Sequence, residues 1–509
     1  MRTDTDRLVL GIDLGTESLR VAAVAPDGTE LASASAGYAS TFPQPDFVEQ
    51  SPADWWQSLR NALGLLSKQV DLKRIQALAI SATSSTVLAV DKNTGEPLGP
   101  ALLWMDSRAK EEAKVINRTG HPALRYSGGQ VSVEWMVPKT LWLRKHMPEL
   151  ATRPYRIVEA LDWLNFKLTG RWAASRLNAV CKWLYVDELG GWDPTLFEQI
   201  GLPDVNEIWP SPVLPVGTPV ERIRPQVAAE LGLASDVLVA QGGIDAHLGL
   251  LGMGVNRPGQ MGLIAGTSFV HMLMSDRPLF HPGLWGPYWA PIYPDQWLIE
   301  GGQISCGSIT RWFRETCCRD LPQTEEAYST LIAEAAQTPP GADGLCLLDF
   351  WQGNRTPYRD PDVSGAIWGL RLHHNRGHLF RAIMEGIACG TRNILEVAAT
   401  AGGNITEIIA SGGATKNRLW MQILADITGR PITISANANA SCLGAAVAAA
   451  VGLGWYPSLV EAADRMTAKG DRIEPDPANA AVYQDLFETY VATCNALFPL
   501  MHNKAAKAR

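Results

Sequence analysis

Short runs of apolar or alternating residues, separated by turn residues, open the chain. Residues 8–13, 19–25 and 29–34 form these runs, and the sequences "GTES" and "PDG" stand between them. Alternation with a period of two between tight polar turns is typical of antiparallel strands. The pattern therefore predicts a three-stranded meander near the N-terminus.

Helical and extended patterns alternate after this meander. The segment "SPADWWQSLRNALGLLSKQV" from Ser51 begins with a helix-start signal and predicts a helix, and residues 75–81 predict a strand. Farther along, "VLVAQGGIDAHLGLLGMG" from Val237 predicts a strand, a Gly-Gly turn and a helix. A mixture of this kind indicates an α/β fold.

The same order of elements returns in the C-terminal half. "QMGLIAGTSFVHMLMS" from Gln260 predicts a strand, a Gly-Thr-Ser turn and a strand, and "EIIASGGATKNRLWMQILADITGRPI" from Glu407 predicts a strand, a Gly-Gly turn and a helix. This weak internal repeat predicts two α/β domains, residues 1–250 and 251–509. We expect a ligand cleft between them, because clefts between domains are preferred binding places.

The charge, the cysteines and the apolar segments of the chain indicate which kinds of binding partner to expect. The 509 residues are 46% hydrophobic and carry a net charge of −8 without a long basic run, so we expect no nucleic-acid partner. The eight cysteines form no CxxC pair, which favours a reducing compartment. The start "MRTDTDRLVL" lacks a signal-peptide core, and the apolar run from Cys442 is too short to cross a membrane. We therefore expect a cytoplasmic protein without a membrane partner.

Two turns have the composition of phosphate-binding hairpins. Thr16 and Ser18 lie in the first turn, and Gly266, Thr267 and Ser268 form the second. Backbone N–H groups and hydroxyls in such turns can hold phosphate. A plain hairpin is the alternative for either turn alone, but each turn opens a similar predicted domain. The sequence contains neither a P-loop nor a dinucleotide fingerprint after the first strand.

A carboxylate, Asp13, stands two residues before Gly15 of the first turn. It would repel phosphate unless a cation lies between them. ATP arrives with Mg²⁺, a hard cation that carboxylates, waters and phosphates hold. We therefore expect Asp13 on the metal side of the site, bound through water. The alternative is an aspartate that only caps its own turn.

The sequence "SGGATKN" from Ser411 ends a predicted strand and opens a helix. Glycines allow a ring or a sugar to approach the backbone closely. Gly412, Gly413 and Ala414 are therefore candidates for adenosine contact, with Asn417 as a hydrogen-bonding partner. A tight strand-to-helix turn without a ligand is the alternative.

Asp245 in "GGIDAHLG" is the candidate general base. It stands at a predicted helix start, where the helix N-terminus favours the ionised form. A carboxylate that faces a phosphate site can accept the proton of an attacking hydroxyl. An aspartate that serves only as a helix cap is the alternative.

With these motifs in place, the sequence resembles the FGGY family of carbohydrate kinases over roughly residues 8–453. The segment "GAIWGLRLHHNRGHLFRAIME" from Gly365 is similar to the family's second signature, and "PKTLWLRKH" from Pro138 is similar to part of the first. Lys139 and Trp142 fit that first signature, whereas Met136 and Thr140 depart from it, which affects the expected sugar rather than membership. The resemblance implies two ribonuclease-H-like domains of the actin-like ATPase class, with ATP and Mg²⁺ as cofactors.

The resemblance also assigns residues. "DLGTESLR" resembles the first phosphate motif, "AGTS" the second, "SGGATKN" the adenosine motif and "GGIDAH" the motif of the catalytic base. The nucleotide-binding residues implied in this way are Asp13, Thr16, Ser18, Arg20, Gly266, Thr267, Gly412, Gly413, Ala414 and Asn417, and Asp245 is the implied base. Asn439 stands where the family often has a glutamate.

The expected sugar-binding residues are Thr83, Ser84, Trp104, Asp106, Glu134 and Asp245. The stretch "SATSST" carries neither the Arg-Glu pair of glycerol kinases nor the Met-His pair of xylulose kinases. "WMDSRA" and "GGQVSVEWMVPK" resemble the branch that phosphorylates ribulose and related pentuloses. Asp106 and Glu134 are expected to accept sugar hydroxyls, and Trp104 to form an apolar wall. The alternatives are a turn aspartate, a surface glutamate and a core tryptophan.

The sequence thus predicts an ATP-dependent pentulose kinase that favours ribulose. Two alternatives stay open. One is a xylulose, sugar or polyol kinase of the same family, and the other is an actin-like nucleotide switch without a sugar acceptor. Trp104, Asp106, Glu134 and Asp245 separate the kinase from a switch, which would not require them. The oligomeric state stays open, with a homodimer as one option.

Overall fold

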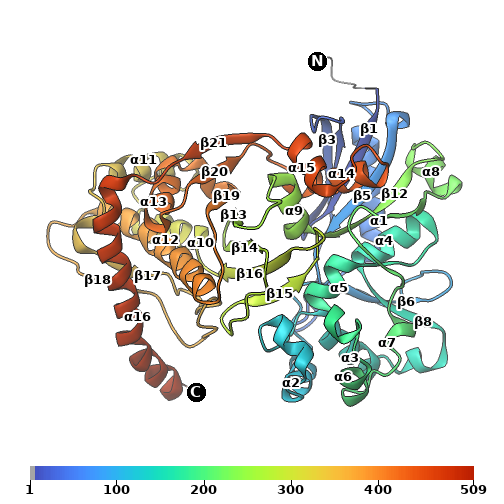
Figure 1. Cartoon of the computed structure of the whole chain (residues 1–509), viewed down its shortest axis with the longest axis horizontal. Coiled ribbons are helices and arrows are strands. Elements are labelled where there is room, and N and C mark those ends of the chain that lie inside the picture. The colour runs from blue at the N-terminus through green and yellow to red at the C-terminus, as the bar shows by residue number, and fades with distance from the viewer. Residues whose placement is uncertain (1–5, 509) are drawn as a thin grey trace. The chain divides into compact units, whose positions relative to one another are not determined.

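The computed structural model describes residues 6–508 of the chain, which divides into two compact units (Figure 1). The first unit comprises Met1–Arg257, Gly286–Leu298 and Asn439–Ala468, and the second comprises Pro258–Trp285, Ile299–Ala438 and Lys469–Arg509. Neither unit is one continuous stretch of chain. The division of function at about residue 250 therefore remains a prediction, separate from this division into units.

A six-stranded sheet with the strand order β11-β12-β5-β1-β2-β3 forms the centre of the first unit. Its strands are β1 (Leu8–Leu14), β2 (Ser18–Val24), β3 (Glu30–Gly37), β5 (Ile75–Ala82), β11 (Pro219–Arg222) and β12 (Leu238–Ile244). β1, β2 and β3 pair antiparallel, so the predicted meander is confirmed, and β5 runs parallel to both β1 and β12. The α/β class predicted from the sequence is likewise confirmed.

Helices pack on the two faces of this sheet. Leu8, Leu10 and Ile12 point into a core that includes Trp55 of α1 (Pro52–Leu66). Because side chains alternate along a strand, Gly11 points to the opposite face. There a Cβ atom on Gly11 would lie 1.9 Å from the carbonyl oxygen of Cys442 in α14 (Ala440–Gly452), so only glycine permits this contact.

The Gly-Gly pair before Asp245 does not form the turn that the sequence predicts. Gly242 and Gly243 belong to β12, whose register with β5 shifts between Ala240 and Gly243. A Cβ atom on Gly242 would lie 1.7 Å from the carbonyl oxygen of Ile80. The glycines thus serve close strand approach, and α9 (Asp245–Met253) follows β12 without an intervening turn.

Smaller elements complete the first unit. A four-stranded sheet has the order β4-β7-β6-β8, and β9 pairs with β10. These strands are β4 (Glu49–Gln50), β6 (Val87–Asp91), β7 (Ala101–Leu102), β8 (Tyr155–Glu159), β9 (Ala174–Ser175) and β10 (Val213–Leu214). The remaining helices are α2 (Lys110–Arg118), α3 (Met136–His146), α4 (Ala160–Thr169), α5 (Arg176–Lys182), α6 (Pro194–Gln199), α7 (Val205–Ile208), α8 (Pro225–Leu231) and α15 (Leu459–Met466).

The second unit repeats the arrangement of a hairpin followed by parallel strands. Its sheet has the strand order β16-β14-β13-β19-β20-β21. The strands are β13 (Gln260–Ala265), β14 (Phe269–Ser275), β16 (Trp297–Gln303), β19 (Glu407–Ser411), β20 (Ile432–Ser435) and β21 (Lys469–Ile473). β13 and β14 pair antiparallel, whereas β13, β19 and β20 run parallel. This matches the order of β1, β2 and β5 and explains the repeat in the sequence.

Helices and a short strand pair complete the second unit. The helices are α10 (Gly307–Cys317), α11 (Glu326–Ala336), α12 (Arg376–Thr400), α13 (Arg418–Thr428) and α16 (Ala480–Ala508). The strand pair is β17 (Cys346–Leu348) with β18 (Ala366–Trp368), and β15 (Trp285–Trp289) lies where the chain enters the first unit. Among residues 6–508, no helix combines the length and the apolar composition that crossing a bilayer requires.

Candidate functional site

The first predicted phosphate turn connects β1 to β2. The Gly15 amide donates to the Ser18 carbonyl oxygen over 3.0 Å, which closes a tight hairpin with Thr16 at its tip. Arg20 on β2 lies directly across from Asp13 on β1 in the strand register. The structure therefore brings all four residues of the first motif, Asp13, Thr16, Ser18 and Arg20, into one hairpin.

Three side chains from other segments hold this turn. Tyr38 donates its hydroxyl hydrogen to the Gly15 carbonyl oxygen over 2.5 Å. Gln50 donates from Nε2 to the Thr16 carbonyl oxygen over 2.7 Å. Trp104 donates from its indole Nε1 to the Thr16 hydroxyl oxygen over 3.0 Å. Sequence reasoning did not find Tyr38 or Gln50, because no local pattern reveals which distant residues reach a turn.

Asp13 stands at the end of β1 with little exposure to water. Its Oδ1 accepts a hydrogen bond from Ser81 Oγ over 2.7 Å. Burial raises the pKa of Asp13, while the Ser81 bond and the Arg20 charge work in the opposite direction. A hard carboxylate oxygen beside hydroxyl donors suits Mg²⁺ and its water shell, so the residues present fit the expected cation.

Asp245 is the first residue of α9, and its carboxylate Oδ1 accepts from the next amide, Ala246, over 2.6 Å. The N-cap of α9 is Ile244, so Asp245 does not occupy the N-cap position. Asp245 keeps some exposed surface, yet the protein excludes most water from its carboxylate. This desolvation, followed by the charge of nearby Asp13, raises the pKa of Asp245 to about 7. A carboxylate with such a pKa can exchange a proton near neutral pH.

Thr83 and Ser84 follow the end of β5. The Thr83 hydroxyl lies 2.8 Å from the Thr86 hydroxyl, and Ser84 Oγ donates to Glu159 Oε1 over 3.1 Å. Glu159 is completely buried and also accepts from Asn178 over 2.9 Å. Its burial raises its pKa despite these bonds. Sequence reasoning missed Glu159, which looks like any polar residue at a strand end.

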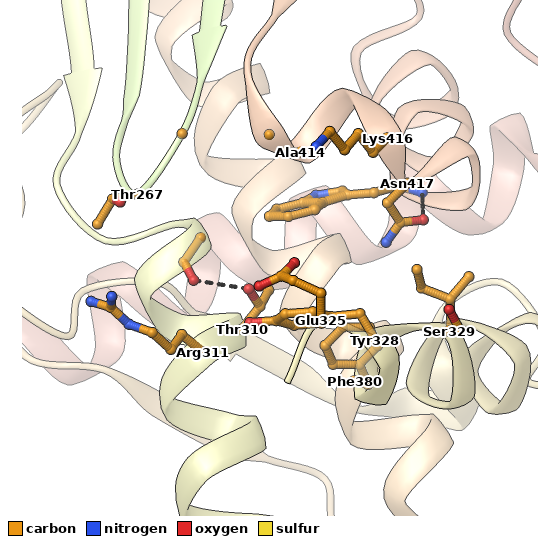
Figure 2. A pocket seen from close by; sticks show the side chains of 15 residues that line it. Thr267, Thr310, Arg311, Glu325, Tyr328, Ser329, Phe380, Ala414, Lys416 and Asn417 are labelled. Atoms are coloured by element: carbon orange, nitrogen blue, oxygen red, sulfur yellow. Dashed lines mark hydrogen bonds between the residues drawn. The ribbon is translucent and has the colours of Figure 1, made fainter. Parts of the chain in front are cut away.

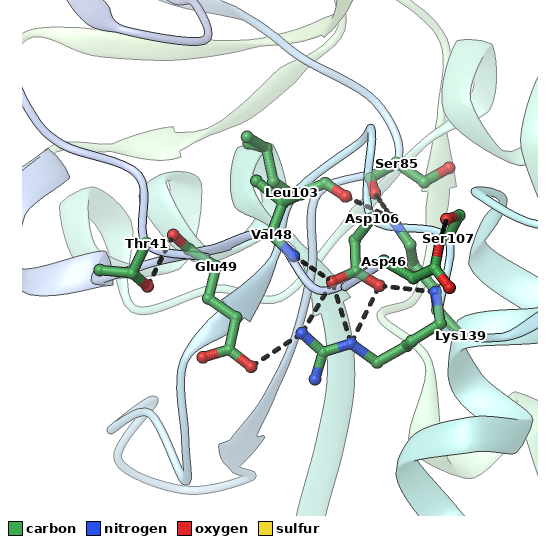
Figure 3. Close-up of polar contacts among 10 residues, drawn as sticks. Thr41, Asp46, Val48, Glu49, Ser85, Leu103, Asp106, Ser107 and Lys139 are labelled. Atoms are coloured by element: carbon green, nitrogen blue, oxygen red, sulfur yellow. Dashed lines mark hydrogen bonds and ion pairs between the residues drawn. The ribbon is translucent and has the colours of Figure 1, made fainter. Parts of the chain in front are cut away.

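Asp106 is completely buried, and residues of its own unit occupy both of its carboxylate oxygens (Figure 3). Oδ2 accepts from the Val48 amide over 2.7 Å, and Arg108 donates to both oxygens over 2.7–2.9 Å. The predicted contact between Asp106 and sugar hydroxyls therefore finds no support in this arrangement. The carboxylate instead anchors the segment that carries Trp104.

Lys139 connects two segments of the expected sugar site (Figure 3). Its buried ammonium donates to the carbonyl oxygens of Ser85 over 2.8 Å and Leu103 over 2.6 Å. Burial lowers the pKa of Lys139 to about 7, although the charges of Asp106, Glu134 and Glu159 oppose this shift. The sequence marks Lys139 only as part of a signature, without this connecting role.

Trp104 and Glu134 both keep accessible surface. Trp104 is 39% exposed as a whole residue, so its ring can receive a ligand while its N–H holds Thr16. Glu134 accepts a hydrogen bond from Ser132 and contributes to the charge around Lys139. In the first unit, Ser84 thus binds Glu159, Trp104 binds Thr16 and Thr83 bonds to Thr86. The charges of Asp106, Glu134 and Glu159 all act on Lys139.

The second unit contains a cavity of about 620 Å³ (Figure 2). Its lining residues are Gly266, Thr267, Gly307, Thr310, Arg311, Glu325, Tyr328, Ser329, Ile332, Phe380, Gly413, Ala414, Lys416, Asn417 and Trp420. Aromatic and aliphatic side chains stand beside polar groups, and the volume lies within the range of about 300–1,000 Å³ that small-ligand sites occupy. The residues present therefore fit a nucleoside with phosphates.

The second phosphate turn forms one wall of this cavity. The Gly266 amide donates to the Ser268 carbonyl oxygen over 3.0 Å, which repeats the geometry of the first turn. The first turn of α10 packs against it, and the Gly307 amide donates to the Gly266 carbonyl oxygen over 3.2 Å. A Cβ atom on Gly307 would lie 2.6 Å from that oxygen, so this close approach needs glycine.

The predicted adenosine motif divides into lining and supporting residues. Gly413, Ala414 and Asn417 line the cavity. Asn417 is also the N-cap of α13, because its Oδ1 accepts from the Trp420 amide over 3.1 Å. Gly412 is not among the lining residues. It has φ +101°, and a Cβ atom there would lie 2.6 Å from the Ala265 carbonyl oxygen, so this position needs glycine.

Two cations that sequence reasoning missed also line the cavity. Figure 2 shows Arg311 on the side of Thr267 and Lys416 beside Ala414. Arg311 follows Gly307 by one helical turn on α10, so its guanidinium can reach an anion at the Gly266–Thr267 turn.

Residues 8–252 match the N-terminal domain of the FGGY family of carbohydrate kinases, and residues 261–453 match its C-terminal domain. The chain is 34% identical to an FGGY carbohydrate kinase domain-containing protein of Xenopus laevis, over 95% of each chain. It is 32% identical to a ribulokinase of Geobacillus thermodenitrificans, over 95% of this chain and 93% of that protein. The structure of a xylulose kinase from Rhodospirillum rubrum superposes with a TM-score of 0.88 at 28% identity, over 97% of this chain and all of that one.

Proposed function

The chain belongs to the FGGY family of carbohydrate kinases, and from this premise we propose that it transfers the γ-phosphoryl group of Mg²⁺-ATP to a hydroxyl of a pentulose, with ribulose favoured. Membership makes the chain a sugar phosphotransferase with two actin-like ATPase units. The observation that carries the proposal is the carboxylate pair of Asp13 and Asp245 beside the Gly15–Ser18 turn. Asp13 could hold a cation, and Asp245, with its raised pKa, could accept a proton.

We assign the nucleotide to the cavity of the second unit. Gly413 and Ala414 would lie against the adenosine, and Thr267 would hold phosphate oxygens through its backbone N–H and its hydroxyl. Gly266 would line the phosphate site and keep the turn tight through its amide bond to Ser268. Arg311 would add a charge-assisted bond to the phosphates. This set supplies the positioning and charge neutralisation on which phosphoryl transfer depends.

Asp13 would hold the cation through water. The cation would then lie between the carboxylate and the phosphates, which explains why a carboxylate stands beside a phosphate turn. Mg²⁺, when bound, neutralises charge on the phosphate oxygens. Ser81 fixes the orientation of Asp13 through its bond to Oδ1, so that the rest of the carboxylate can face the water shell. Thr16 and Ser18 then offer hydroxyl donors on the same hairpin.

Asp245 would accept the proton of the attacking hydroxyl on its carboxylate. Its raised pKa makes the ionised group a stronger base than an exposed aspartate. The shift has a built-in cause, since desolvation and the Asp13 charge both disfavour a second buried anion. The site residues themselves therefore provide the driving force for proton removal.

The sugar would lie against Trp104, with Thr83, Ser84 and Glu134 as hydrogen-bonding partners. Asp106 and Lys139 would support this surface without contacting the sugar, because their polar atoms already form hydrogen bonds to backbone groups. Ribulose is favoured because a ribulokinase is 32% identical over nearly the whole chain, and because the Thr83–Ser84 region carries no charge.

Xylulose, or another sugar or polyol, is the second candidate. The observation that favours it is the likeness to a xylulose kinase structure at 28% identity. An actin-like switch without an acceptor is disfavoured, since both family domains are those of carbohydrate kinases.

A coupled assay of ADP release tests the proposal. The panel would contain both ribuloses, both xyluloses, arabitols, ribitol, erythritol and glycerol, each with Mg²⁺-ATP. We expect the highest kcat/KM with a ribulose. The highest activity with xylulose or glycerol would overturn the sugar assignment. ADP release that does not increase with any compound would overturn the kinase assignment for this panel.

A further inference from the structure

Tyr38 binds the first phosphate turn directly. It follows β3, and its backbone amide donates to the Glu17 carbonyl oxygen over 3.1 Å. Its hydroxyl donates to the Gly15 carbonyl oxygen over 2.5 Å. Since the Gly15 amide already bonds to Ser18, both polar backbone groups of Gly15 are occupied.

The hydroxyl of Tyr38 also lies in the electrostatic field of both candidate catalytic carboxylates. Burial, followed by the charges of Asp13 and Asp245, raises the pKa of Tyr38 well above its ordinary value. The phenol is therefore a weaker acid than an ordinary tyrosine and keeps its proton near neutral pH. A phenol that stays protonated is a permanent hydrogen-bond donor.

A carbonyl oxygen in this place is a problem for an anionic ligand. The Gly15 carbonyl carries a partial negative charge at the turn that would receive phosphate, and Asp13 stands two residues away. A donor on that oxygen offsets part of its charge and fixes the direction of the peptide plane. The plane also sets where the neighbouring Thr16 amide points.

We propose that Tyr38 is a positioning residue for phosphoryl transfer, because its hydroxyl holds the Gly15 carbonyl so that the turn presents its donors to the nucleotide phosphates. The inference rests on the proposed function and adds a residue to it. Tyr38 acts through Gly15 and does not itself contact the reacting atoms.

The hydroxyl is separable from the fold around it. Pairing of β2 with β3, the Tyr38 amide bond to Glu17 and the Gln50 bond to Thr16 all hold the hairpin without the phenol oxygen. The substitution Tyr38→Phe keeps the ring and removes only the donor. We therefore expect this variant to fold.

Tyr293→Phe is the matched control. Tyr293 lies in the same unit, is completely buried, and donates its hydroxyl hydrogen to a backbone carbonyl oxygen, that of Val255, over 2.9 Å. The neighbouring charge that raises the pKa of Tyr293 is that of Asp464, rather than that of Asp13 or Asp245. The control thus removes the same kind of bond, but from a carbonyl oxygen outside the phosphate turn.

The experiment compares wild type with both variants by titration calorimetry and by kinetics. The nucleotide probe is the β,γ-imido analogue of ATP with Mg²⁺, and the sugar probe is the best acceptor of the wild type, titrated without nucleotide. For Tyr38→Phe we expect nucleotide affinity and kcat to fall by about three- to tenfold. Sugar affinity should stay within about twofold, because no sugar contact is lost.

Two results would overturn the inference. One is nucleotide affinity and kcat of Tyr38→Phe within about twofold of wild type. The other is an equal loss in Tyr293→Phe, which would show general loosening of the unit. A wild type that binds the analogue but phosphorylates no sugar would refute the proposed function alone, since calorimetry with the analogue would still decide the role of Tyr38.

Discussion

The indole Nε1 of Trp104 donates a hydrogen bond to the hydroxyl oxygen of Thr16 over 3.0 Å. An indole N–H can only donate, so Thr16 must accept and its own hydrogen points elsewhere. That hydrogen is then free to face a phosphate oxygen. The bond links a residue of the expected sugar wall to a residue of the expected phosphate turn, within a single unit.

Trp104→Phe should therefore affect the nucleotide as well as the sugar. The phenyl ring preserves an apolar wall but cannot orient the Thr16 hydroxyl. We expect KM for Mg²⁺-ATP to rise by about two- to fivefold, the size of one modest hydrogen bond. Steady-state kinetics with either substrate varied measures this. A change confined to the sugar KM would show that the bond to Thr16 has no part in nucleotide binding.

Asp245→Asn should bind both substrates and lose turnover. The amide has nearly the shape of the carboxylate but cannot accept the hydroxyl proton. General-base contributions amount to about 10²- to 10⁴-fold in rate, so we expect kcat to fall by that factor. Sugar binding by calorimetry is the control for folding. A kcat within about threefold of wild type would remove Asp245 from the proposed mechanism.

The same substitution should stabilise the fold at alkaline pH. Asp245 has a folded-state pKa of about 7, above its ordinary value of 3.8, so the folded chain binds this proton more tightly than the unfolded chain. The associated stability is fully present below about pH 3.8, falls as pH rises above that value, and is lost by about pH 7. A neutral amide in place of the carboxylate would remove that loss, so thermal unfolding should show a higher Tm for Asp245→Asn than for wild type at pH 8.

At pH 5.5 this difference in Tm should shrink, because the wild-type carboxylate is then protonated in the folded state. Asp276→Asn provides the control, since Asp276 is exposed and Arg277 lowers its pKa. That variant should show no gain at pH 8. A Tm advantage of Asp245→Asn that is equal at both pH values would contradict the assigned pKa direction.

The pattern of neighbouring residues was sufficient to predict the hairpins, but it could not predict their contacts with distant segments. The β1–β2–β3 meander was predictable because alternation and turn residues are properties of neighbouring positions. The Gly242–Gly243 pair was predicted as a turn and lies in a strand, because its contact with Ile80 depends on a neighbouring strand that no local pattern reveals.

In the candidate site, too, local motifs could be read from the sequence and long-range contacts could not. Asp13 and Asp245 could be chosen as candidates from the sequence because each stands beside a short glycine motif. Tyr38 and Lys139 were not assigned roles, since each acts on a backbone carbonyl oxygen more than twenty residues away in sequence. Asp106 was assigned to the sugar although Arg108 and the Val48 amide occupy its oxygens, a geometry that only the folded chain determines.

Asp13→Ala should weaken binding of Mg²⁺-ATP more than binding of metal-free nucleotide. The reason is that the cation, standing between carboxylate and phosphate, converts repulsion into attraction. Calorimetry with and without Mg²⁺ on the same protein provides both the measurement and its control. Tighter binding of Mg²⁺-ATP by the variant would mean that Asp13 repels phosphate, and the cation would have to be held elsewhere.

Glu134→Gln should reduce the preference between epimeric sugars. Ribulose and xylulose differ in the direction of one hydroxyl, and a carboxylate that accepts from adjacent hydroxyls loses one partner when a hydroxyl turns away. An unpaired buried acceptor costs about 1–3 kcal/mol, so we expect wild type to favour ribulose by roughly ten- to hundredfold in kcat/KM. The amide offers one acceptor oxygen instead of two, so the ratio should shrink while ATP affinity stays constant. Glu149→Gln, on an exposed side chain of the same unit, should leave the ratio unchanged. A ratio that Glu134→Gln does not move would place the discriminating group elsewhere, with Thr83 and Ser84 as the next residues to substitute.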